Sequence, residues 1–490
     1  MMSLKKLFII SILIHLIASV FSTGFYHKDE HFQILEFSAM KLKLTPSECI
    51  AWEYHHQMRP AIQPAIAYGV VKTFQWIGFD NPFYETIFLR MISAILSFIC
   101  IYMLLLVFVR EIHQEWLKKW FIFLSLFLWM LVYQHVRFSS ESWSGSFFFI
   151  GLGLYFYFLD KQIINSLTLF ITGVIIGFSF IIRFQTGFMI GGFLLWLLIV
   201  RREKYLNLSF LILGLFVSFS IGLLFDYWLY ERWVLTAWHY LNINIIQDKV
   251  SSFGLDPWWY YIYKTFIIAI PPYSILLIGS FFTIWIFYPK NVISWVILPF
   301  LIIHTLIGHK EIRFLIPIVN TIPIVIILVL QKVIEDKRLS GIKYYFDRFS
   351  WKWFYRSFLV INVILLMVIC LKPSDRMINF YKYVYDNNYS KLYFMGKNPY
   401  RYYTICKNFY KRKTLNVIEI QDLSELKNYV DGSKEKLFFV VDKFNINNEL
   451  SETKLKYKLI FRNLPEWSTH FNINNWLKRT KVLSLYEIDP

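Results

Sequence analysis

Long apolar segments constrain the fold of this chain more than any other feature of its sequence. A helix needs about 20 mainly apolar residues to cross the hydrocarbon core of a bilayer. Eleven segments come near that length, at about residues 7–23, 86–109, 119–135, 143–159, 163–182, 184–200, 207–225, 262–288, 291–307, 314–330 and 357–371. We therefore expect an all-α polytopic membrane protein with about eleven transmembrane helices.

The composition agrees with that class. Of the 490 residues, 57% are hydrophobic and 17% are charged, and the mean hydropathy is +0.45. Soluble proteins average about 45–50% apolar and about 25% charged residues, so the sequence excludes a soluble enzyme and a disordered chain. The 4 cysteines form no C-x-x-C pair and no disulfide framework, which gives redox and metal chemistry little support.

Basic residues set the expected orientation, because Lys and Arg are enriched in short cytoplasmic loops. Lys5 and Lys6 precede the first span, which we expect to remain uncleaved. Alternate later loops also carry Lys or Arg, at residues 110–119, 160–162, 201–204, 289–290 and 331–356. We therefore expect a cytoplasmic N-terminus and a C-terminus on the far side. Orientation accounts for much of the net charge of +18, so no nucleic-acid partner is expected.

The far side carries longer segments. Two outer loops are expected, at residues 24–85 and 226–261, and the second is rich in the Trp and Tyr typical of membrane interfaces. After residue 371 the hydropathy falls, and short apolar runs predict strands at 415–420, 437–441, 457–461 and 482–488, with a helix at 422–430. We expect a transmembrane domain of residues 1–371 and a small extracytoplasmic α/β domain of residues 372–490.

The first outer loop opens with two adjacent carboxylates, Asp29 and Glu30, flanked by His27 and His31. Such a pair at a bilayer edge can supply a general base that deprotonates a hydroxyl. The alternative is a solvated helix start. The residues themselves do not decide which carboxylate is the base.

Further polar side chains recur near the predicted far-side ends of spans. Trp52, Glu53 and Arg59 suit a sugar, since an aromatic face packs on C–H groups while charged groups bind hydroxyls, but they also suit an interfacial helix. Charged and amide residues near hydrocarbon are by default functional or paired, with a snorkelling arginine as the alternative. Those between spans are Arg137, Glu141, Arg183 and Gln185.

The densest cluster is His309-Lys310-Glu311-Ile312-Arg313-Phe314, between two apolar segments. Its three basic residues can bind the phosphate of a lipid-linked donor. A charged turn, in which Glu311 neutralises one base, is the alternative. We favour phosphate binding.

Three segments together resemble the polyprenol-phosphate-mannose-dependent mannosyltransferases of N-glycan and GPI-anchor assembly, glycosyltransferase family 22. These segments are His27-Lys28-Asp29-Glu30-His31-Phe32-Gln33, then Trp52-Glu53 with Arg59, and His309-Lys310-Glu311-Ile312-Arg313-Phe314. The family's motifs typically read H-P-D-E, T-W-E and H-K-E-x-R-F, in the same order and with similar spacing. The tail, with Leu464-Pro465-Glu466-Trp467, Asn475-Trp476-Leu477-Lys478-Arg479 and Ser484-Leu485-Tyr486-Glu487, is similar to that of the GPI third-mannose transferases.

The chain departs from the family's pattern at three positions. Lys28 replaces the usual Pro, Ala51 replaces Thr, and Ile312 replaces an acid common in the third motif. None of these changes removes a proposed catalytic group, but they leave the acceptor open. A bacterial relative acting on an envelope glycan is compatible with the sequence.

The resemblance implies the GT-C glycosyltransferase fold and an inverting reaction. Mannose would pass from a β-linked polyprenyl (dolichyl-type) phosphate to a hydroxyl of a membrane-associated glycan or glycolipid, giving an α-mannoside, α-1,2 in the most similar group. The expected partners are this donor, this acceptor and the lipid bilayer; the oligomeric state is left open. The active site is expected on the extracytoplasmic side, either the periplasmic face of a bacterial inner membrane or the lumenal face of the endoplasmic reticulum.

Residue roles follow from the same resemblance. The base is assigned to Asp29 or Glu30, and the donor phosphate to His309, Lys310, Arg313 and Arg183. Sugar or acceptor contacts are assigned to His27, Gln33, Trp52, Glu53, Arg59, Arg137, Glu141, Gln185, Glu311 and Trp258. No cofactor and no metal are expected, because basic side chains can neutralise the leaving phosphate.

A transporter or flippase of lipid-linked glycans is the competing class. It would share the hydrophobicity and the basic phosphate contacts, but it should place its polar residues near the membrane midplane. Here they cluster at the far-side ends of spans, beside large outer loops, which favours chemistry. A noncatalytic assembly subunit would not account for three family motifs.

Overall fold

The chain forms two compact units. The computed structural model describes residues 4–431, 435–444, 446–452, 455–480 and 482–489. The first of the two units, which we call the helical unit, comprises Met1–Ser22, His55–Ile66 and Ile87–Lys372. The second, the mixed unit, comprises Thr23–Tyr54, Ala67–Thr86 and Pro373–Pro490. Residues of the predicted first outer loop therefore belong to both units.

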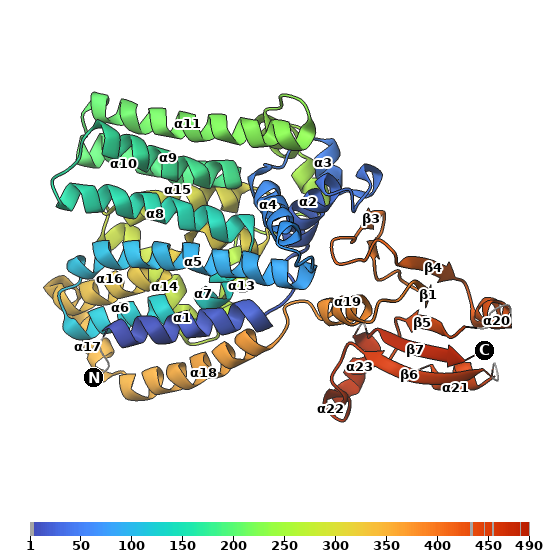
Figure 1. Cartoon of the computed structure of the whole chain (residues 1–490). Helices are drawn as coiled ribbons and strands as arrows, with labels where there is room; N and C mark the ends of the chain where they lie inside the picture. Colours follow the sequence, from blue (N-terminus) through green and yellow to red (C-terminus); the bar gives the residue numbers. More distant parts are fainter. Residues whose placement is uncertain (1–3, 432–434, 445, 453–454, 481, 490) are drawn as a thin grey trace. The chain divides into compact units, whose positions relative to one another are not determined.

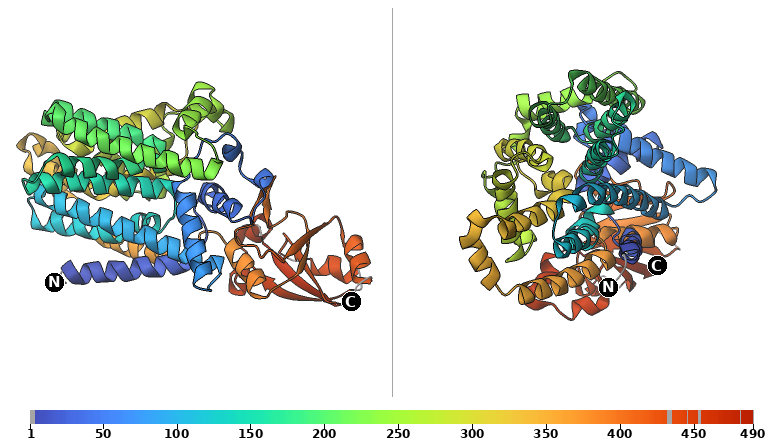
Figure 2. Two further views of the ribbon diagram at one scale, coloured as in Figure 1. Left: turned by 45° about the horizontal axis from the view of Figure 1, so that its top comes forward. Right: turned by 90° about the vertical axis from the view of Figure 1, so that its left-hand side faces the viewer.

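The helical unit is built from long apolar helices, seen nearly end-on in the right-hand view of Figure 2. These are α1 (Leu4–Phe21), α5 (Pro82–Phe108), α6 (Glu115–Phe127), α7 (Trp129–His135), α8 (Ser140–Asp160), α9 (Ser166–Ile182), α10 (Gly187–Trp196), α11 (Tyr205–Tyr230), α14 (Tyr273–Phe287), α15 (Val292–Leu306), α16 (Ile322–Glu335) and α18 (Trp351–Leu371). The shorter helical elements of this unit are η3 (Val109–Glu111), η4 (Phe184–Thr186), η5 (Leu197–Arg201), α12 (Thr236–Leu241), η6 (Asn242–Ile246), η7 (Lys249–Phe253), α13 (Tyr260–Ile268), η8 (Ile312–Thr321), η9 (Lys337–Leu339) and α17 (Ser340–Arg348). Two further helices have residues in both units, α3 (Trp52–His55) and α4 (Ile62–Trp76).

The predicted membrane class is confirmed, with a smaller number of unambiguous spans. Among the described residues, seven helices are long and apolar enough to cross a membrane, or nine if each of two bent pairs is one span. The pair α6 and α7 bends by 44°, and the pair α14 and α15 by 119°. The helix α9 is apolar but shorter. Each of the eleven predicted segments thus overlaps an apolar helix or pair, whereas seven to nine meet the criterion for a span.

The break between α6 and α7 is stabilised by one side chain. Leu128 takes an extended conformation there, which interrupts the helical hydrogen bonds. Asn362 on α18 replaces them, because its Oδ1 accepts from the Trp129 N–H at 3.0 Å and its Nδ2 donates to the Phe127 carbonyl at 2.9 Å. Backbone groups at membrane depth need such partners, since lipid offers none.

Glycines set how closely α9 packs between α8 and α11 (Figure 1). A Cβ at Gly173 of α9 would lie 2.0 Å from the Leu211 carbonyl oxygen, and one at Gly214 of α11 would lie 2.2 Å from that of Phe170. Only glycine allows this backbone approach, which is the usual role of small residues between membrane helices.

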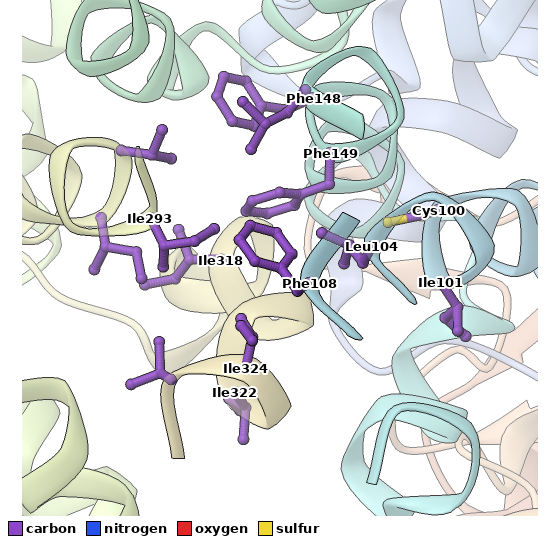
Figure 3. Close-up of a cluster of buried hydrophobic side chains, with 14 of the residues drawn as sticks. Cys100, Ile101, Leu104, Phe108, Phe148, Phe149, Ile293, Ile318, Ile322 and Ile324 are labelled. Atoms are coloured by element: carbon purple, nitrogen blue, oxygen red, sulfur yellow. The ribbon is translucent and has the colours of Figure 1, made fainter. Parts of the chain in front are cut away.

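The centre of the helical unit is apolar. Figure 3 shows Phe148 and Phe149 of α8 near Phe108 of α5, with Ile293 of α15 and Ile318 of η8 close by. All five are at most 3% exposed. This core holds α8, which carries Glu141, and η8, which carries Arg313.

A buried polar chain also reaches η8. His15 Nε2 of α1 lies 3.2 Å from His135 Nδ1 of α7, and His135 Nε2 lies 2.8 Å from Asn320 Oδ1 of η8. Both imidazoles are about 1% exposed or less. The chain therefore joins three elements inside the helical unit, and buried polar groups are stable there only when they are paired.

The mixed unit contains a five-stranded sheet of order β4-β1-β5-β7-β6, whose strands are labelled in Figure 1. The strand β1 (Lys391–Met395) pairs in parallel with β4 (Asn416–Ile420) and β5 (Leu437–Val441). The strand β7 (Ser484–Asp489) is antiparallel to β5 and to β6 (Lys456–Arg462). A separate hairpin pairs β2 (Arg401–Tyr402) with β3 (Ile405–Cys406). The remaining elements are η1 (Glu30–Leu35), α2 (Glu36–Lys41), η2 (Ser47–Cys49), α19 (Met377–Asp386), α20 (Leu423–Asp431), α21 (Asn447–Glu452), α22 (Glu466–Thr469), η10 (Ile473–Asn475) and α23 (Trp476–Arg479).

The predicted α/β character of this region is confirmed. Strands β4, β5, β6 and β7 and the helix α20 overlap the predicted segments. Phe439, Tyr486 and Leu426 are fully buried between sheet and helix. The strand β1, which lies between β4 and β5, was not predicted, because its apolar run is only four residues long and follows a lysine.

Candidate active site

A buried ionic network in the helical unit joins three of the predicted site residues. Glu141 lies in the first turn of α8, Arg183 directly follows α9, and Arg313 is the second residue of η8. Glu141 Oε1 is 3.0 Å from Arg183 Nη1 and 3.1 Å from Arg313 Nη1. All three side chains are at most 8% exposed, so one carboxylate holds two guanidinium groups away from water.

Two more residues of the third motif complete this network. Glu311 binds Arg313 through both oxygens, at 2.7 Å to Nε and 3.1 Å to Nη2. The ring centroid of Phe314 lies 5.3 Å from the Arg313 guanidinium carbon and 5.6 Å from that of Arg183. The aromatic ring thus contacts both cations, an arrangement that favours planar guanidinium groups.

The Arg183 guanidinium group retains an N–H that can donate a further hydrogen bond. It donates to Ser140 Oγ at 3.0 Å and pairs with Glu141, while its buried Nε has no hydrogen-bond partner within the part of the chain that the structure describes. An unsatisfied buried donor is costly, and such groups often mark a ligand site. The network can therefore accept a further anion at Arg183.

Lys310 and His309 are held by a residue that the sequence analysis did not single out, Asp256. The Asp256 Oδ2 atom accepts from the Lys310 N–H at 3.0 Å and lies 3.9 Å from His309 Nδ1. The other ring nitrogen of His309, Nε2, lies 3.3 Å from Glu311 Oε1. The Lys310 ammonium donates to the carbonyls of Asp256, Ile307 and Gly308, at 3.0, 2.6 and 3.3 Å. Burial lowers the pKa of Lys310, and the Asp256 carboxylate opposes that shift. Lys310 therefore orders this loop, and a phosphate would have to displace a carbonyl to bind it.

Arg59 and Gln185 both contact Tyr240 of α12, a second residue that was not predicted from the sequence. Gln185 Nε2 donates to the Tyr240 hydroxyl at 2.8 Å, and the Arg59 guanidinium carbon lies 5.6 Å from the centre of its ring. Tyr230 fixes this segment by donating to the Arg59 carbonyl at 2.8 Å. Because Gln185 follows Arg183 by two residues, this group adjoins the ionic network.

Arg137 and Trp258 are two further residues of the helical unit for which the sequence predicts a role in the site. Arg137 is 1% exposed and binds the end of α1, donating to the Ser22 carbonyl and, at 2.7 Å, to Ser22 Oγ. Trp258 is 67% exposed, two residues after Asp256. The sugar-binding roles of Arg137 and Trp258 stay predictions from the sequence.

The carboxylate pair belongs to the mixed unit, where its two members differ. Glu30 Oε1 accepts the main-chain N–H groups of Tyr26 and His27, at 3.2 and 3.3 Å, so its side chain folds back on the turn before η1. Asp29 Oδ1 instead lies 3.4 Å from His27 Nδ1, and its side chain is 24% exposed. A carboxylate beside an imidazole at a solvent-accessible turn can accept a proton.

The second motif supports the first within the same unit. Gln33 Nε2 of η1 donates to Glu53 Oε1 of α3 at 2.9 Å, and both side chains are at most 9% exposed. Trp52, which begins α3, is half-buried. The motifs of residues 27–33 and 52–53 are therefore brought together within the mixed unit.

Among the described residues, no group of three His, Cys, Asp or Glu side chains could hold a metal ion. The prediction of a metal-free site thus remains a matter for experiment.

Comparison with known proteins adds family information. Residues 6–409 match the model of the Alg9-like mannosyltransferase family. GPI alpha-1,2-mannosyltransferase 3 of Mus musculus is 23% identical over 278 residues, covering 55% of this chain and 48% of the mouse protein. GPI mannosyltransferase 3 of Candida albicans is 27% identical over 326 residues, covering 65% and 62%. The chain thus spans about half the length of the mouse protein.

A solved structure has the same fold. ArnT from Cupriavidus metallidurans, bound to undecaprenyl phosphate, superposes with a TM-score of 0.58 at 11% identity, covering 98% of this chain and 97% of ArnT. At this identity the similarity is one of fold. It confirms the predicted GT-C class.

Proposed function

Because the chain belongs to the Alg9-like mannosyltransferase family, we propose that it transfers mannose from a polyprenyl phosphate to a hydroxyl of a membrane-associated glycan or glycolipid. The observation that carries this proposal is the family match over residues 6–409, which includes every predicted site residue. The GPI mannosyltransferase relatives support an α-mannoside product, with α-1,2 linkage as in the name of the mouse protein.

The Glu141–Arg183–Arg313 network is the proposed phosphate site. Breaking the sugar–phosphate bond converts a phosphodiester with one negative charge into a monoester with up to two. Buried guanidinium groups can stabilise that added charge without rearranging. Arg183, with a donor still unused, is the side chain best placed to contact it. A polyprenyl phosphate is also the ligand of ArnT, which shares this fold.

Asp29 is the proposed base. Glu30 is occupied by two main-chain N–H groups, whereas Asp29 pairs with His27. In a single displacement, Asp29 would take the acceptor's hydroxyl proton while the oxygen bonds to the anomeric carbon and polyprenyl phosphate leaves. The configuration at that carbon would invert. We place this reaction on the extracytoplasmic face, at the far-side ends of the spans.

The test is transfer by purified protein in lipid nanodiscs. Polyprenyl-phosphate mannose, polyprenyl-phosphate glucose and GDP-mannose would be offered with membrane glycolipid extracts. We expect transfer from the first donor, and a loss of about 10²- to 10⁴-fold in Asp29→Asn, since the amide cannot accept the proton.

Asp80→Asn is the matched control, because Asp80 is an exposed acid of the same predicted outer loop. It should retain wild-type turnover. Transfer from GDP-mannose alone would contradict the donor assignment. Wild-type turnover in both Asp29→Asn and Glu30→Gln would remove the pair from the mechanism.

A further inference from the structure

Glu36 of α2 is a fully buried carboxylate with three partners, all in the mixed unit. Its Oε1 lies 2.9 Å from His31 Nε2 and accepts the Phe409 N–H at 3.0 Å. Its Oε2 accepts from Thr45 Oγ1 at 2.7 Å. His31 is 1% exposed and Glu36 is 0% exposed. Both oxygens of this carboxylate are therefore engaged.

The residue after Phe409 contacts the other member of the pair. The Tyr410 ring stacks on the His31 imidazole, with centroids 5.7 Å apart and planes at 13°. Tyr410 is itself stacked on Phe83 at 5.1 Å and on Tyr381 at 6.2 Å. Two consecutive residues of the C-terminal region thus bind both members of the His31–Glu36 pair.

This pair adjoins the carboxylates of the first motif. His31 directly follows Glu30 in η1, a π-helical turn, and Glu36 begins the next helix. Residues 31–39 are all buried, whereas Asp29 and Glu30 are only half-buried at the start of the turn. Asp29 and Glu30 therefore stand at the half-buried start of a turn whose following residues, 31–36, are held in the interior of the mixed unit.

Stability alone does not require a carboxylate and an imidazole here. Burying a carboxylate and an imidazole costs desolvation free energy, and apolar residues of similar volume often stabilise such a site as well or better. What the pair and its partners add is a fixed geometry. Single-turn π-helices are moreover frequent at functional sites.

We propose that Phe409 and Tyr410 of the C-terminal region position Asp29 and Glu30 for catalysis, acting through His31 and Glu36. His31 and Glu36 are then positioning residues, and the C-terminal region is part of the catalytic apparatus. This inference rests on the proposed function, because it assumes that the carboxylates act on substrate.

The test compares variants that disturb the pair to different degrees. Glu36→Gln keeps an acceptor for the Phe409 N–H but removes the charge that faces His31, and Tyr410→Ala removes the stacked ring. Since a displacement of about 1 Å can cost about 100-fold in rate, we expect kcat to fall by about 10- to 100-fold in both. The donor KM should stay within about twofold, and Tyr410→Phe, which keeps the ring, should restore most of the activity.

Asn408→Ala is the matched control. Asn408 Nδ2 donates to the Leu44 carbonyl at 3.2 Å, so it links the same two segments without contacting His31 or Glu36. It should leave kcat per folded molecule unchanged. All rates are normalised to folded protein, measured by size exclusion and thermal unfolding.

The outcomes separate this inference from the proposed function. If Asp29→Asn and Glu30→Gln both turn over like wild type, the proposed base is wrong whatever Glu36→Gln does. If those two are inactive while Glu36→Gln and Tyr410→Ala keep wild-type kcat per folded molecule, positioning is overturned. A rise in donor KM with unchanged kcat, or a loss of folded protein alone, overturns it too.

Discussion

Arg313 contacts two carboxylates, Glu141 and Glu311, while its ring neighbour Phe314 also contacts Arg183. Its replacement should therefore affect both folding and donor binding. Arg313→Ala leaves Glu311 with fewer partners, and breaking a buried pair costs about 3–5 kcal/mol in the free energy of unfolding. Among folded molecules, losing one charge-assisted contact should weaken donor affinity about 10- to 100-fold.

Arg313→Lys should recover only part of that affinity, because lysine keeps the charge but lacks the two-pronged geometry. Binding of a fluorescent polyprenyl-phosphate sugar to nanodisc protein measures both effects. Arg232→Ala, at an exposed arginine of the predicted second outer loop, serves as the control. Equal donor affinity in Arg313→Ala and Arg232→Ala would mean that the third motif is only a charged turn.

The affinity for the sugar donor is expected to depend on pH through Lys310. Burial lowers the pKa of its ammonium below that of an ordinary lysine. The charged form attracts phosphate and predominates below the pKa, so donor affinity should fall as pH rises through this lowered value. Titrating donor binding from pH 7 to 10 in wild type and Lys310→Met measures the effect. Superimposable profiles would show that Lys310 acts only through the carbonyls that it orders.

The basic side chains of the third motif and Arg183 also bear on metal dependence. They can supply the positive charge that a divalent ion would otherwise bring to the leaving phosphate. Transfer should therefore continue in EDTA at an undiminished rate. A complete loss that Mg²⁺ or Mn²⁺ restores would instead make Asp29, Glu30 and nearby histidines candidate ligands.

Between elements, the close approach of α8 and η8 determines whether Glu141 can reach Arg313. Gly145 of α8 permits it, because a Cβ there would lie 2.3 Å from the Pro317 carbonyl oxygen. Gly145→Ala should force the two elements apart and lower turnover at least tenfold, by misplacing charges about 1 Å. Gly279→Ala is the control, since nothing lies within 4 Å of a Cβ there.

That control should leave turnover unchanged and slightly raise thermal stability, as alanine favours helix over glycine. Both variants are measured by transfer assays and thermal unfolding in the same detergent. If Gly145→Ala turned over like Gly279→Ala, the α8–η8 spacing would not matter to the reaction.

Elements were predictable from sequence where their signal is local. Apolar windows located every long helix, and short apolar runs located four of the five strands of the sheet. The sequence could not show that Leu128 interrupts a span, because Asn362, which binds the Trp129 N–H, lies 233 residues beyond Trp129. Asp256 and Tyr240 were missed for the same reason, as their partners belong to distant loops. The motifs identified charged groups, but not which of them pair with one another.

For the whole molecule, the orientation derived from basic loops is directly testable. A tag within residues 331–356 and one after Pro490 should report opposite sides of the membrane, with the first cytoplasmic, because seven Lys and Arg residues lie in that loop. Protease protection of sealed vesicles measures this, and a tag at residues 201–204 provides a second cytoplasmic reference. If both tags were found in the cytoplasm, the proposal that the active site lies on the far side of the membrane would be wrong.

The contact between Glu36 and Phe409 also means that the first motif is synthesised well before one of the residues that hold it in place. The two residues are 373 positions apart, and a ribosome adding about 5–20 residues per second needs roughly 20–75 s to cover that distance. Through this interval the nascent chain carries Asp29 and Glu30 without the residues that hold His31 and Glu36. An unfinished or truncated chain ending before Phe409 would thus enter the bilayer with an immature first motif, so the protein would acquire its activity only after Phe409 has been synthesised.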